Sequence, residues 1–268
     1  SVAVVILNYN TREQLVKFLP KLFKTNYENL RLVVADNGSK DGSFDYLRQH
    51  HRDRLTILDL EENHGFAGGY NRALGQVDAD YFVLLNSDVA VTEDWISPVI
   101  STMESDSSIG AAQPKVLSQT QPDHFEYAGA AGGFMDVWGY PFCRGRVMDV
   151  VEKDTGQYDD TMEVFWATGA ALFISKKTFQ QIGGFDGNFF AHMEEIDLCW
   201  RLKRAGFKIM AIPASTVYHV GGGTLDYQSP FKTYLNFRNN YYLLTKNLPL
   251  TTLLWLIPWR LILDGAAA

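Results

Sequence analysis

The amino-terminal third of the chain alternates short apolar runs with segments of helical spacing. The run at 2–7 is rich in β-branched residues and predicts a strand buried on both faces, and further apolar runs predict strands at 30–35, 55–60 and 81–85. The segments between them predict helices at 11–24, 44–49 and 66–76. Such alternation predicts an α/β fold, a mostly parallel sheet with helices on both faces.

Polar residues follow each predicted strand. In open α/β sheets, ligands bind beyond the carboxyl ends of the strands. The residues at those ends are Tyr9 and Asn10, Asp36, the segment 63–69, and Asn86, Ser87 and Asp88. We therefore expect the binding site along this edge.

The remainder of the chain has a different pattern. From about 113 to 145 it is rich in glycine and aromatic residues, which predicts loops and short antiparallel strands over the site. We expect further strands and helices at 164–175, 194–205, 208–212, 217–220 and 230–246.

The last apolar segment, 248–263, is shorter than the ~20 residues that span a bilayer. Pro258 and Arg260 interrupt it, and Trp255 and Trp259 suit a membrane interface. Two interpretations stay open: a helix packed on the domain, or peripheral contact with a membrane surface.

Composition narrows the class of protein. Asp and Glu outnumber Lys and Arg by 31 to 24, which argues against a nucleic-acid partner. The two cysteines lie far apart in sequence, and the chain shows no cleavable signal peptide. These features favour a reducing, cytoplasmic compartment, at the inner face of the membrane if 248–263 binds lipid.

Several candidate site residues have two interpretations. Asp88 could cap a helix that starts near Thr92, although Thr92 itself is the better N-cap. In the other interpretation the chain is extended here, so Asn86 and Asp88 point the same way and could both bind Mg²⁺ or Mn²⁺. Asp36 lies in a turn sequence, yet it could also accept hydrogen bonds from a ribose or a base.

The segment "NHGFAGGYNRAL" has the same ambiguity. Its glycines could present backbone amides to an anion, or could allow close packing of helix on sheet. His219 follows a strand and precedes three glycines, so it is a structural histidine or a metal ligand.

A helix predicted from Glu194 carries two carboxylates in its first turn. Leu198, Cys199, Leu202 and Ala205 form its inner stripe, and Asp197, Arg201 and Arg204 its outer face. Glu195 falls on the inner stripe and Glu194 on its border. They either cap the helix or provide a general base, and Asp197 with Arg201 predicts an ion pair.

Six segments resemble, in order, those of family 2 glycosyltransferases of the bacterial rhamnosyltransferase-like subgroup. They are "VVILNYN", "VVADNGSKDGS", "NHGFAGGYNRAL", "LLNSDV", "ATGAALFISKKTFQQIGGFDGNFFAHMEEIDLCWRLKRAGF" and "VYHVGGGT". The resemblance covers most of the chain. It implies a GT-A fold, Mg²⁺ or Mn²⁺, and inverting transfer from a UDP-, dTDP- or GDP-linked sugar to a saccharide or lipid-linked acceptor in cell-surface polysaccharide synthesis.

The resemblance also implies residue roles. Asp88 and His219 would bind the metal, Glu195 or Glu194 would be the general base, and Arg238 of "NFRN" would face a phosphate. Residues 1–247 would form one domain: a nucleotide-binding half (1–112), an acceptor half (113–229) and a terminal helix (230–247), followed by the tail 248–268. The nucleotide would contact Leu7, Tyr9, Asn10, Asp36, Asn63, Gly65, Phe66, Asn71, Asn86 and Ser87.

This sequence departs from the family pattern at two positions. Asn86 replaces the first Asp of the metal motif, and Glu195 replaces the second residue of the usual Glu-Asp pair. The alternatives are therefore a nucleotide-sugar-binding protein without catalysis and a sugar nucleotidyltransferase. A nicotinamide-dependent oxidoreductase is disfavoured because no GxGxxG follows the first strand.

Overall fold

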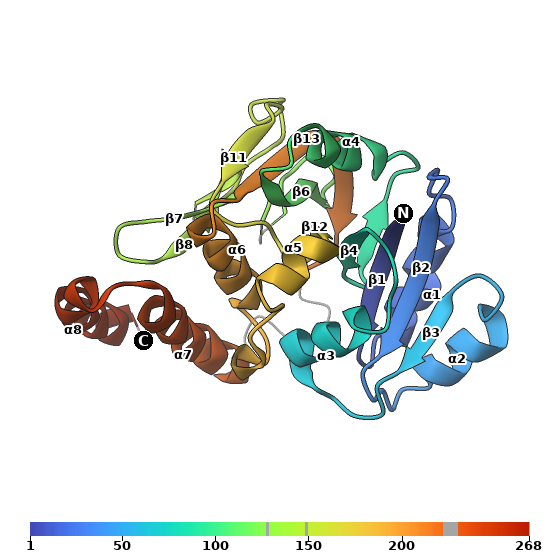
Figure 1. Cartoon of the computed structure of the whole chain (residues 1–268), viewed down its shortest axis with the longest axis horizontal. Helices are drawn as coiled ribbons and strands as arrows, with labels where there is room; N and C mark the ends of the chain where they lie inside the picture. Colours follow the sequence, from blue (N-terminus) through green and yellow to red (C-terminus); the bar gives the residue numbers. More distant parts are fainter. Residues whose placement is uncertain (127–128, 148–149, 222–229, 268) are drawn as a thin grey trace.

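A computed structural model describes residues 1–126, 129–147, 150–221 and 230–267. Within these residues the strands form one nine-stranded and one four-stranded sheet (Figure 1). Gly222 and Gly223, which follow the His219 region, lie outside the described residues. The expected α/β fold class is confirmed.

Half of the large sheet is wholly parallel. Its strands, in spatial order, are β4 (Tyr81–Leu85), β1 (Val2–Asn8), β2 (Leu30–Asp36) and β3 (Thr56–Asp59). Asn8 pairs with Asp36 at the last position of the β1–β2 ladder. The polar residues after these strands therefore share one edge, as expected from the sequence.

Alternation along β1 divides the core into two layers. Val2, Val4 and Ile6 pack with α1 (Arg12–Leu22) and α4 (Ser97–Ser105). Ala3 and Val5 pack with α3 (Gly65–Leu74) and α6 (Glu194–Arg204) on the opposite face. Figure 1 shows α3, α6 and α5 (Lys176–Gln181) in front of the sheet. The helix α2 (Ser43–His50) precedes β3.

The other half of the sheet is mixed. The antiparallel strand β12 (Ala171–Ser175) joins β4 to β6 (Ile109–Ser118), and β6 runs parallel to β13 (Lys208–His219). The strands β11 (Met162–Val164) and β5 (Val89–Val91) pair antiparallel with β13.

Four boundary predictions are wrong. The region 164–175 contains parts of two strands, β11 and β12, and the two strands expected at 208–220 form the single strand β13. Residues 113–118 belong to the buried strand β6 rather than to a loop, because β12 and β13 cover both of its edges. Helix α4 begins at Ser97, so Thr92 does not cap it.

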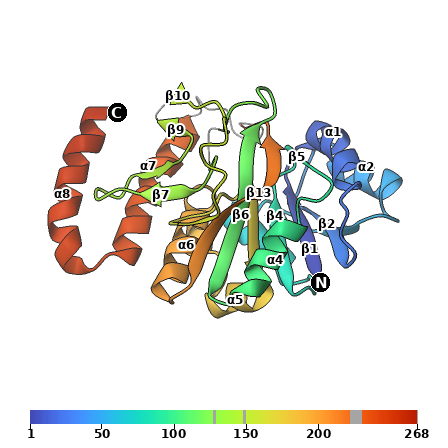
Figure 2. The ribbon, with the colours of Figure 1, turned by 90° about the horizontal axis from the view of Figure 1, so that it is seen from above.

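Short antiparallel strands after β6 are confirmed. They are β7 (Gly133–Met135), β8 (Pro141–Cys143), β9 (Arg146–Val147) and β10 (Val150–Val151). Two helices then complete the chain, α7 (Pro230–Asn247) and α8 (Leu250–Ala267). Figure 2 shows them side by side, at the end of the molecule away from α1 and α2. No helix within the described residues is long and apolar enough to cross a membrane.

Candidate active site

Asp36 lies at the carboxyl ends of β1 and β2 and is held there by hydrogen bonds. One of its carboxylate oxygens accepts a hydrogen bond from Asn8 Nδ2 (2.7 Å) and the other from the Ser39 amide (2.9 Å). Asn10 lies in the left-handed region (φ 55°), and its Oδ1 accepts from the Lys40 amide (2.7 Å). These contacts agree with the turn interpretation of Asp36, and the nucleotide contacts of Tyr9, Asn10 and Asp36 stay predictions.

The start of α3 is packed against the segment before α6. The Phe66 and Ala67 amides donate to the Phe190 carbonyl (2.6 and 3.3 Å), and the Gly65 amide donates to Asn63 Oδ1 (2.9 Å). A Cβ on Gly65 would lie 2.6 Å from the Phe190 oxygen. The structure therefore favours close packing over an open anion site, because these amides already have partners.

Two more residues of this predicted pocket have packing contacts. A Cβ on Gly69 would lie 2.8 Å from Leu7 Cδ2, so Gly69 allows α3 to approach β1 closely. The Asn71 side chain donates to the Phe185 carbonyl (2.8 Å) and accepts from the Phe185 amide (3.0 Å). Asn71 thus fastens α3 to the segment before α6, and a nucleotide contact from Leu7 or Asn71 stays a prediction.

Residues 86–89 form a turn. The Val89 amide donates to the Asn86 carbonyl (3.3 Å), which closes a four-residue β-turn. The expectation that Asn86 and Asp88 lie in extended geometry is therefore wrong. Ser87 and Asp88 are both buried in this turn.

Pairing of β5 with β13 brings Asp88 to His219. Val89 lies opposite His219 in the ladder, and His219 Nε2 is 3.0 Å from Asp88 Oδ1. His219 Nδ1 is 3.3 Å from Glu126 Oε1, an ion-pair distance. Burial alone would lower the pKa of His219, but contacts with Asp88 and Glu126 raise it to about 10.

Glu126 is a site residue that sequence reasoning missed. It precedes the glycine- and aromatic-rich stretch and belongs to no local motif, and its amide donates to the Val116 carbonyl of β6 (3.0 Å). Its side chain is buried against His219. Only the pairing of strands distant in sequence reveals this position.

These residues fit a divalent cation. Asp88 Oδ1 and His219 Nε2 share a proton in this structure, and Mn²⁺ or Mg²⁺ would have to displace that proton to use both atoms as ligands, with phosphate and water oxygens completing its coordination. Glu126 lies at the other ring nitrogen, where carboxylates commonly orient metal-binding histidines. Among the described residues, no cluster of three or more His, Cys, Asp or Glu side chains has metal-binding geometry. Phosphate oxygens would therefore have to complete the coordination.

The first turn of α6 buries two neighbouring carboxylates. Among the described residues, Oε2 of Glu194 and Oε2 of Glu195 are buried atoms without a hydrogen-bond partner. Burial, followed by the charge of Glu195, raises the pKa of Glu194 well above its usual range. Burial raises the pKa of Glu195 to about 7, although backbone amides oppose this. A group with this pKa can take up a proton near neutral pH.

A strained segment leads into these glutamates. Phe190, His192 and Met193 all have left-handed backbones, with φ of 64°, 70° and 70°. Phe190 (ψ −64°) forms a γ-turn, in which the Ala191 amide donates to the Phe189 carbonyl (2.8 Å). Each such residue costs about 1–3 kcal/mol, and strain of this kind concentrates at functional sites.

Residues Gly169 and Ala170 connect the glutamates to the 86–89 turn. A Cβ on Gly169 would lie 3.9 Å from Glu195 Cβ, and the Asn86 amide donates to the Ala170 carbonyl (3.0 Å). Tyr70 lies beneath the same edge, with its hydroxyl near the Leu85 carbonyl (3.3 Å). The structure thus brings Glu195 and the Asn86–Asp88 turn to opposite ends of one short segment.

Two other predictions concern α6 and α7. Asp197 was expected on the outer face but is fully buried, because Lys246 Nζ (2.9 Å) and Asn247 Nδ2 (3.0 Å) from α7 bind it. Its predicted ion pair with Arg201 is confirmed at 2.8 Å. Arg238 donates to the Phe189 carbonyl (3.0 Å) and to Asn239 Oδ1 (2.9 Å); its contact with a phosphate stays a prediction.

Comparison with known proteins agrees with this arrangement. The profile of "Glycosyl transferase family 2" matches residues 3–165. An N-acetylglucosaminyl-diphospho-decaprenol L-rhamnosyltransferase of Mycobacterium tuberculosis is 27% identical over 81% of this chain and 75% of its own length. The rhamnosyltransferase WbbL of Escherichia coli is 25% identical over 81% of this chain and 83% of its own. The rhamnosyltransferase-like resemblance is confirmed.

Solved structures confirm the GT-A fold. GalNAc-T7 with UDP, GalNAc and Mn²⁺ superposes with a TM-score of 0.69 over 91% of this chain and 47% of its own, at 14% identity. The mannosyltransferase PcManGT of Pyrobaculum calidifontis, in complex with GDP-Man and Mn²⁺, gives 0.59 over 82% of this chain and 56% of its own, at 15% identity. This chain thus spans about half the length of each. Because the family profile covers more than half of its residues, the chain belongs to glycosyl transferase family 2.

Proposed function

We propose that the protein is a metal-dependent, inverting glycosyltransferase that acts on a nucleotide-diphosphate sugar. The observation that carries the proposal is the pair of buried carboxylates at Glu194 and Glu195, connected through residues 169–170 to the Asn86–Asp88 turn. Burying two neighbouring carboxyl groups, each with an Oε2 atom that has no hydrogen-bond partner among the described residues, is costly, and a catalytic role accounts for keeping them. Residues 1–247 would form the catalytic domain, with the nucleotide held mainly by 1–112 and the acceptor by 113–229.

Glu195 is the better candidate for the general base. Its pKa of about 7 suits proton uptake at neutral pH, and its side chain is more exposed than that of Glu194. Glu195 would accept the proton of the acceptor hydroxyl as that oxygen bonds to the anomeric carbon. The bond from this carbon to the diphosphate breaks, and the diphosphate leaves with the electron pair. Attack opposite the leaving group inverts the anomeric configuration.

Asp88 and His219 would hold a divalent cation over the edge of the sheet. When bound, the cation would neutralise charge on the departing diphosphate. Asp88 supplies the carboxylate, and His219, oriented by Glu126, supplies the imidazole nitrogen. The two solved neighbours are complexes with Mn²⁺, one with UDP and one with GDP-Man, which supports this choice of cation.

The names of the relatives support a substrate class. Two of them are rhamnosyltransferases, and one name specifies a lipid-diphosphate saccharide acceptor. We therefore favour a UDP-, dTDP- or GDP-linked rhamnosyl or related hexosyl donor. The acceptor would be a saccharide carried on a lipid diphosphate, in the synthesis of cell-surface polysaccharide.

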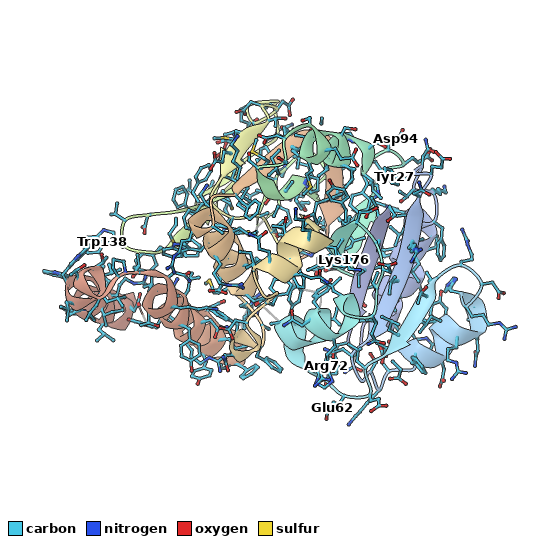
Figure 3. The ribbon with its side chains drawn as sticks, viewed as in Figure 1. Tyr27, Glu62, Arg72, Asp94, Trp138 and Lys176 are labelled. Carbon is cyan, nitrogen blue, oxygen red and sulfur yellow. The ribbon has the colours of Figure 1, made fainter. Side chains whose placement is uncertain are left out.

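The outward face of α8 supports contact with a lipid surface. Its two charged residues, Arg260 and Asp264, are buried and paired (3.1 Å), and Arg260 also donates to the Trp138 carbonyl (2.9 Å; Figure 3 shows Trp138 beside α8). The exposed apolar residues are Leu250, Leu254, Trp255, Trp259, Leu261, Ile262 and Leu263. A helix with its charges inward and an apolar outer face suits an interfacial position.

A flotation assay with liposomes tests the lipid contact. Replacing Leu254 and Ile262 with Glu should abolish flotation, because two charges would enter the apolar layer. Val16→Glu, at an exposed apolar residue of α1, is the matched control and should float normally. Equal flotation of wild type, the Leu254/Ile262 double variant and Val16→Glu would exclude α8 as the lipid contact. If the double variant floats normally but no longer forms dimers, the partner of α8 is a second copy of the chain.

Substitution of the glutamates tests the catalytic proposal. Glu195→Gln should abolish sugar transfer while leaving binding of the nucleotide unchanged, and Glu194→Gln should retain measurable transfer. Glu163→Gln, at an exposed position of β11, is the control. NMR of the product should show the anomeric configuration opposite to that of the donor. Normal turnover by Glu195→Gln would remove the assigned base, and retention of configuration would exclude the single-displacement mechanism.

A further inference from the structure

Asn239 of α7 lies beneath the segment that leads into the two glutamates. It is fully buried, and its Nδ2 lies 2.9 Å from the Phe189 carbonyl, 2.8 Å from that of Ala191 and 2.8 Å from that of His192. Its Oδ1 accepts from Arg238 Nε (2.9 Å). A single side-chain amide thus contacts three carbonyls within four residues.

These carbonyls need such a donor because their backbone is irregular. The γ-turn at Phe190 and the left-handed residues His192 and Met193 direct successive peptide groups away from any helix or strand ladder. Buried carbonyls without partners would be costly. Among the described residues, Asn239 is the donor recorded for the Ala191 and His192 carbonyls, and it adds a contact to the Phe189 carbonyl, which already accepts from the Ala191 amide.

Arg238 extends the same support. Its guanidinium donates to the carbonyls of Asn188 (3.3 Å) and Phe189 (3.0 Å), and it lies over the rings of Tyr234 and Tyr242 (5.6 and 5.4 Å). With Asn239, it connects α7 to four carbonyls between residues 188 and 192. The next residue, Met193, caps α6, and Glu194 begins it.

We propose that Asn239 is a positioning residue that holds residues 189–193 in the strained path that places Glu195 for proton abstraction. This inference rests on the proposed role of Glu195 as the base. Because the same segment accepts hydrogen bonds from α3 at Phe190, the path is fixed from both sides: by α3 through the Phe66 amide and by α7 through Asn239. Loss of the hydrogen bonds from Asn239 should displace the two glutamates, although Asn239 itself is not among the residues expected to contact the nucleotide.

The neighbouring residue Asn240 provides a matched control. It has the same side chain on the same helix and is also buried, but its Nδ2 donates to the Gly139 carbonyl (3.0 Å), far in sequence from the glutamates. Asn239→Ala and Asn240→Ala both delete a buried asparagine side chain. Asn239→Ala alone releases the segment before α6.

Steady-state kinetics and calorimetry distinguish positioning from general stability. For Asn239→Ala we expect kcat to fall by about tenfold to a hundredfold, since misplacement near 1 Å can cost that much. The dissociation constant of the nucleotide should change less than about twofold. Asn240→Ala should keep near-normal kcat at a comparable loss of melting temperature. Equal kcat values for the two variants would overturn the proposal, as would a loss of nucleotide affinity in Asn239→Ala that matches its loss of kcat.

A rescue experiment tests the link to backbone strain. Met193 has φ 70°, a conformation that glycine adopts without strain. In the Asn239→Ala background, Met193→Gly should restore kcat at least about threefold more than Met193→Ala, because both remove the side chain but only glycine relaxes the backbone. Equal effects of the two substitutions would overturn the proposal.

The outcome with Glu195→Gln separates the two claims. If Glu195→Gln is inactive and Asn239→Ala retains normal kcat, the base assignment stands and the positioning role fails. If Glu195→Gln remains active, the proposed base itself is wrong, whatever Asn239→Ala does.

Discussion

Replacing Glu195 with Gln should stabilise the fold at neutral pH while it removes activity. The carboxyl group lies in a buried site where Oε2 has no hydrogen-bond partner among the described residues. Ionisation there is unfavourable, and burial raises the pKa of Glu195 from 4.5 to about 7. A glutamine has nearly the same shape and never ionises, so it avoids this cost.

The size and sign of the effect follow from linkage. A pKa that is higher in the folded state means that the unfolded chain loses its proton first, so stability falls as pH rises from about 4.5 to about 7. Each pKa unit corresponds to about 1.4 kcal/mol, so the full effect above pH 7 is on the order of 3 kcal/mol. For a chain of this size, that corresponds to a melting temperature about 5–10 °C higher in Glu195→Gln.

Differential scanning calorimetry between pH 4.5 and 8 measures this difference directly. The melting temperatures of wild type and Glu195→Gln should converge near pH 4.5 and separate steadily up to about pH 7. Glu163→Gln, which alters a half-exposed carboxylate paired with Lys203, should show no such gain. A difference between wild type and Glu195→Gln that does not vary with pH would refute the argument from burial.

Three further predictions concern other buried contacts. Asp197→Ala should destabilise the fold by about 1–3 kcal/mol in urea denaturation, because it removes the buried carboxylate that binds Arg201, Lys246 and Asn247; a loss below about 0.5 kcal/mol would contradict this. Glu126→Gln should weaken Mn²⁺ binding by about 10–100-fold in calorimetry, because His219 loses its orienting charge, whereas unchanged affinity would argue against that orienting role. Gly65→Ala should lower the free energy of unfolding by more than about 1–2 kcal/mol, because φ is 70° and the new Cβ would clash with the Phe190 carbonyl. An unchanged melting temperature would show that the segment around Phe190 moves to make room.

The parallel half of the sheet was predictable because its signals are local. Its four strands are short, mainly apolar runs, and a segment of helical spacing follows each of the first three along the chain; the predicted boundaries of β1, β2 and β4 differ by at most one residue from the structure. The common edge where the polar residues lie could also be predicted, because the carboxyl ends of parallel strands meet at one edge of the sheet. The contacts within that edge did not follow from topology, because the Phe66 and Ala67 amides bond to Phe190 and the Asn71 side chain bonds to Phe185, more than a hundred positions away.

The remaining errors come from contacts that local patterns do not contain. Asn86–Asp88 was read as extended because apolar residues continue on both sides, but β4 and β5 pair with different strands and the chain must turn between them. Asp197 was placed outward because its neighbours on the helix are charged, whereas its partners lie on α7, about fifty residues away. Glu126 has no motif at all, and strand pairing alone brings it to His219.

Calorimetric titration of UDP, dTDP and GDP, with and without Mn²⁺, tests the central claim most directly. It should be carried out on wild type, Asp88→Ala and Glu195→Gln. We predict that one nucleotide binds wild type only with Mn²⁺, that Asp88→Ala abolishes this binding, and that Glu195→Gln preserves it. Absence of binding by all three nucleotides, or equal binding by Asp88→Ala, would contradict the assignment of a metal-diphosphate site at Asp88 and His219.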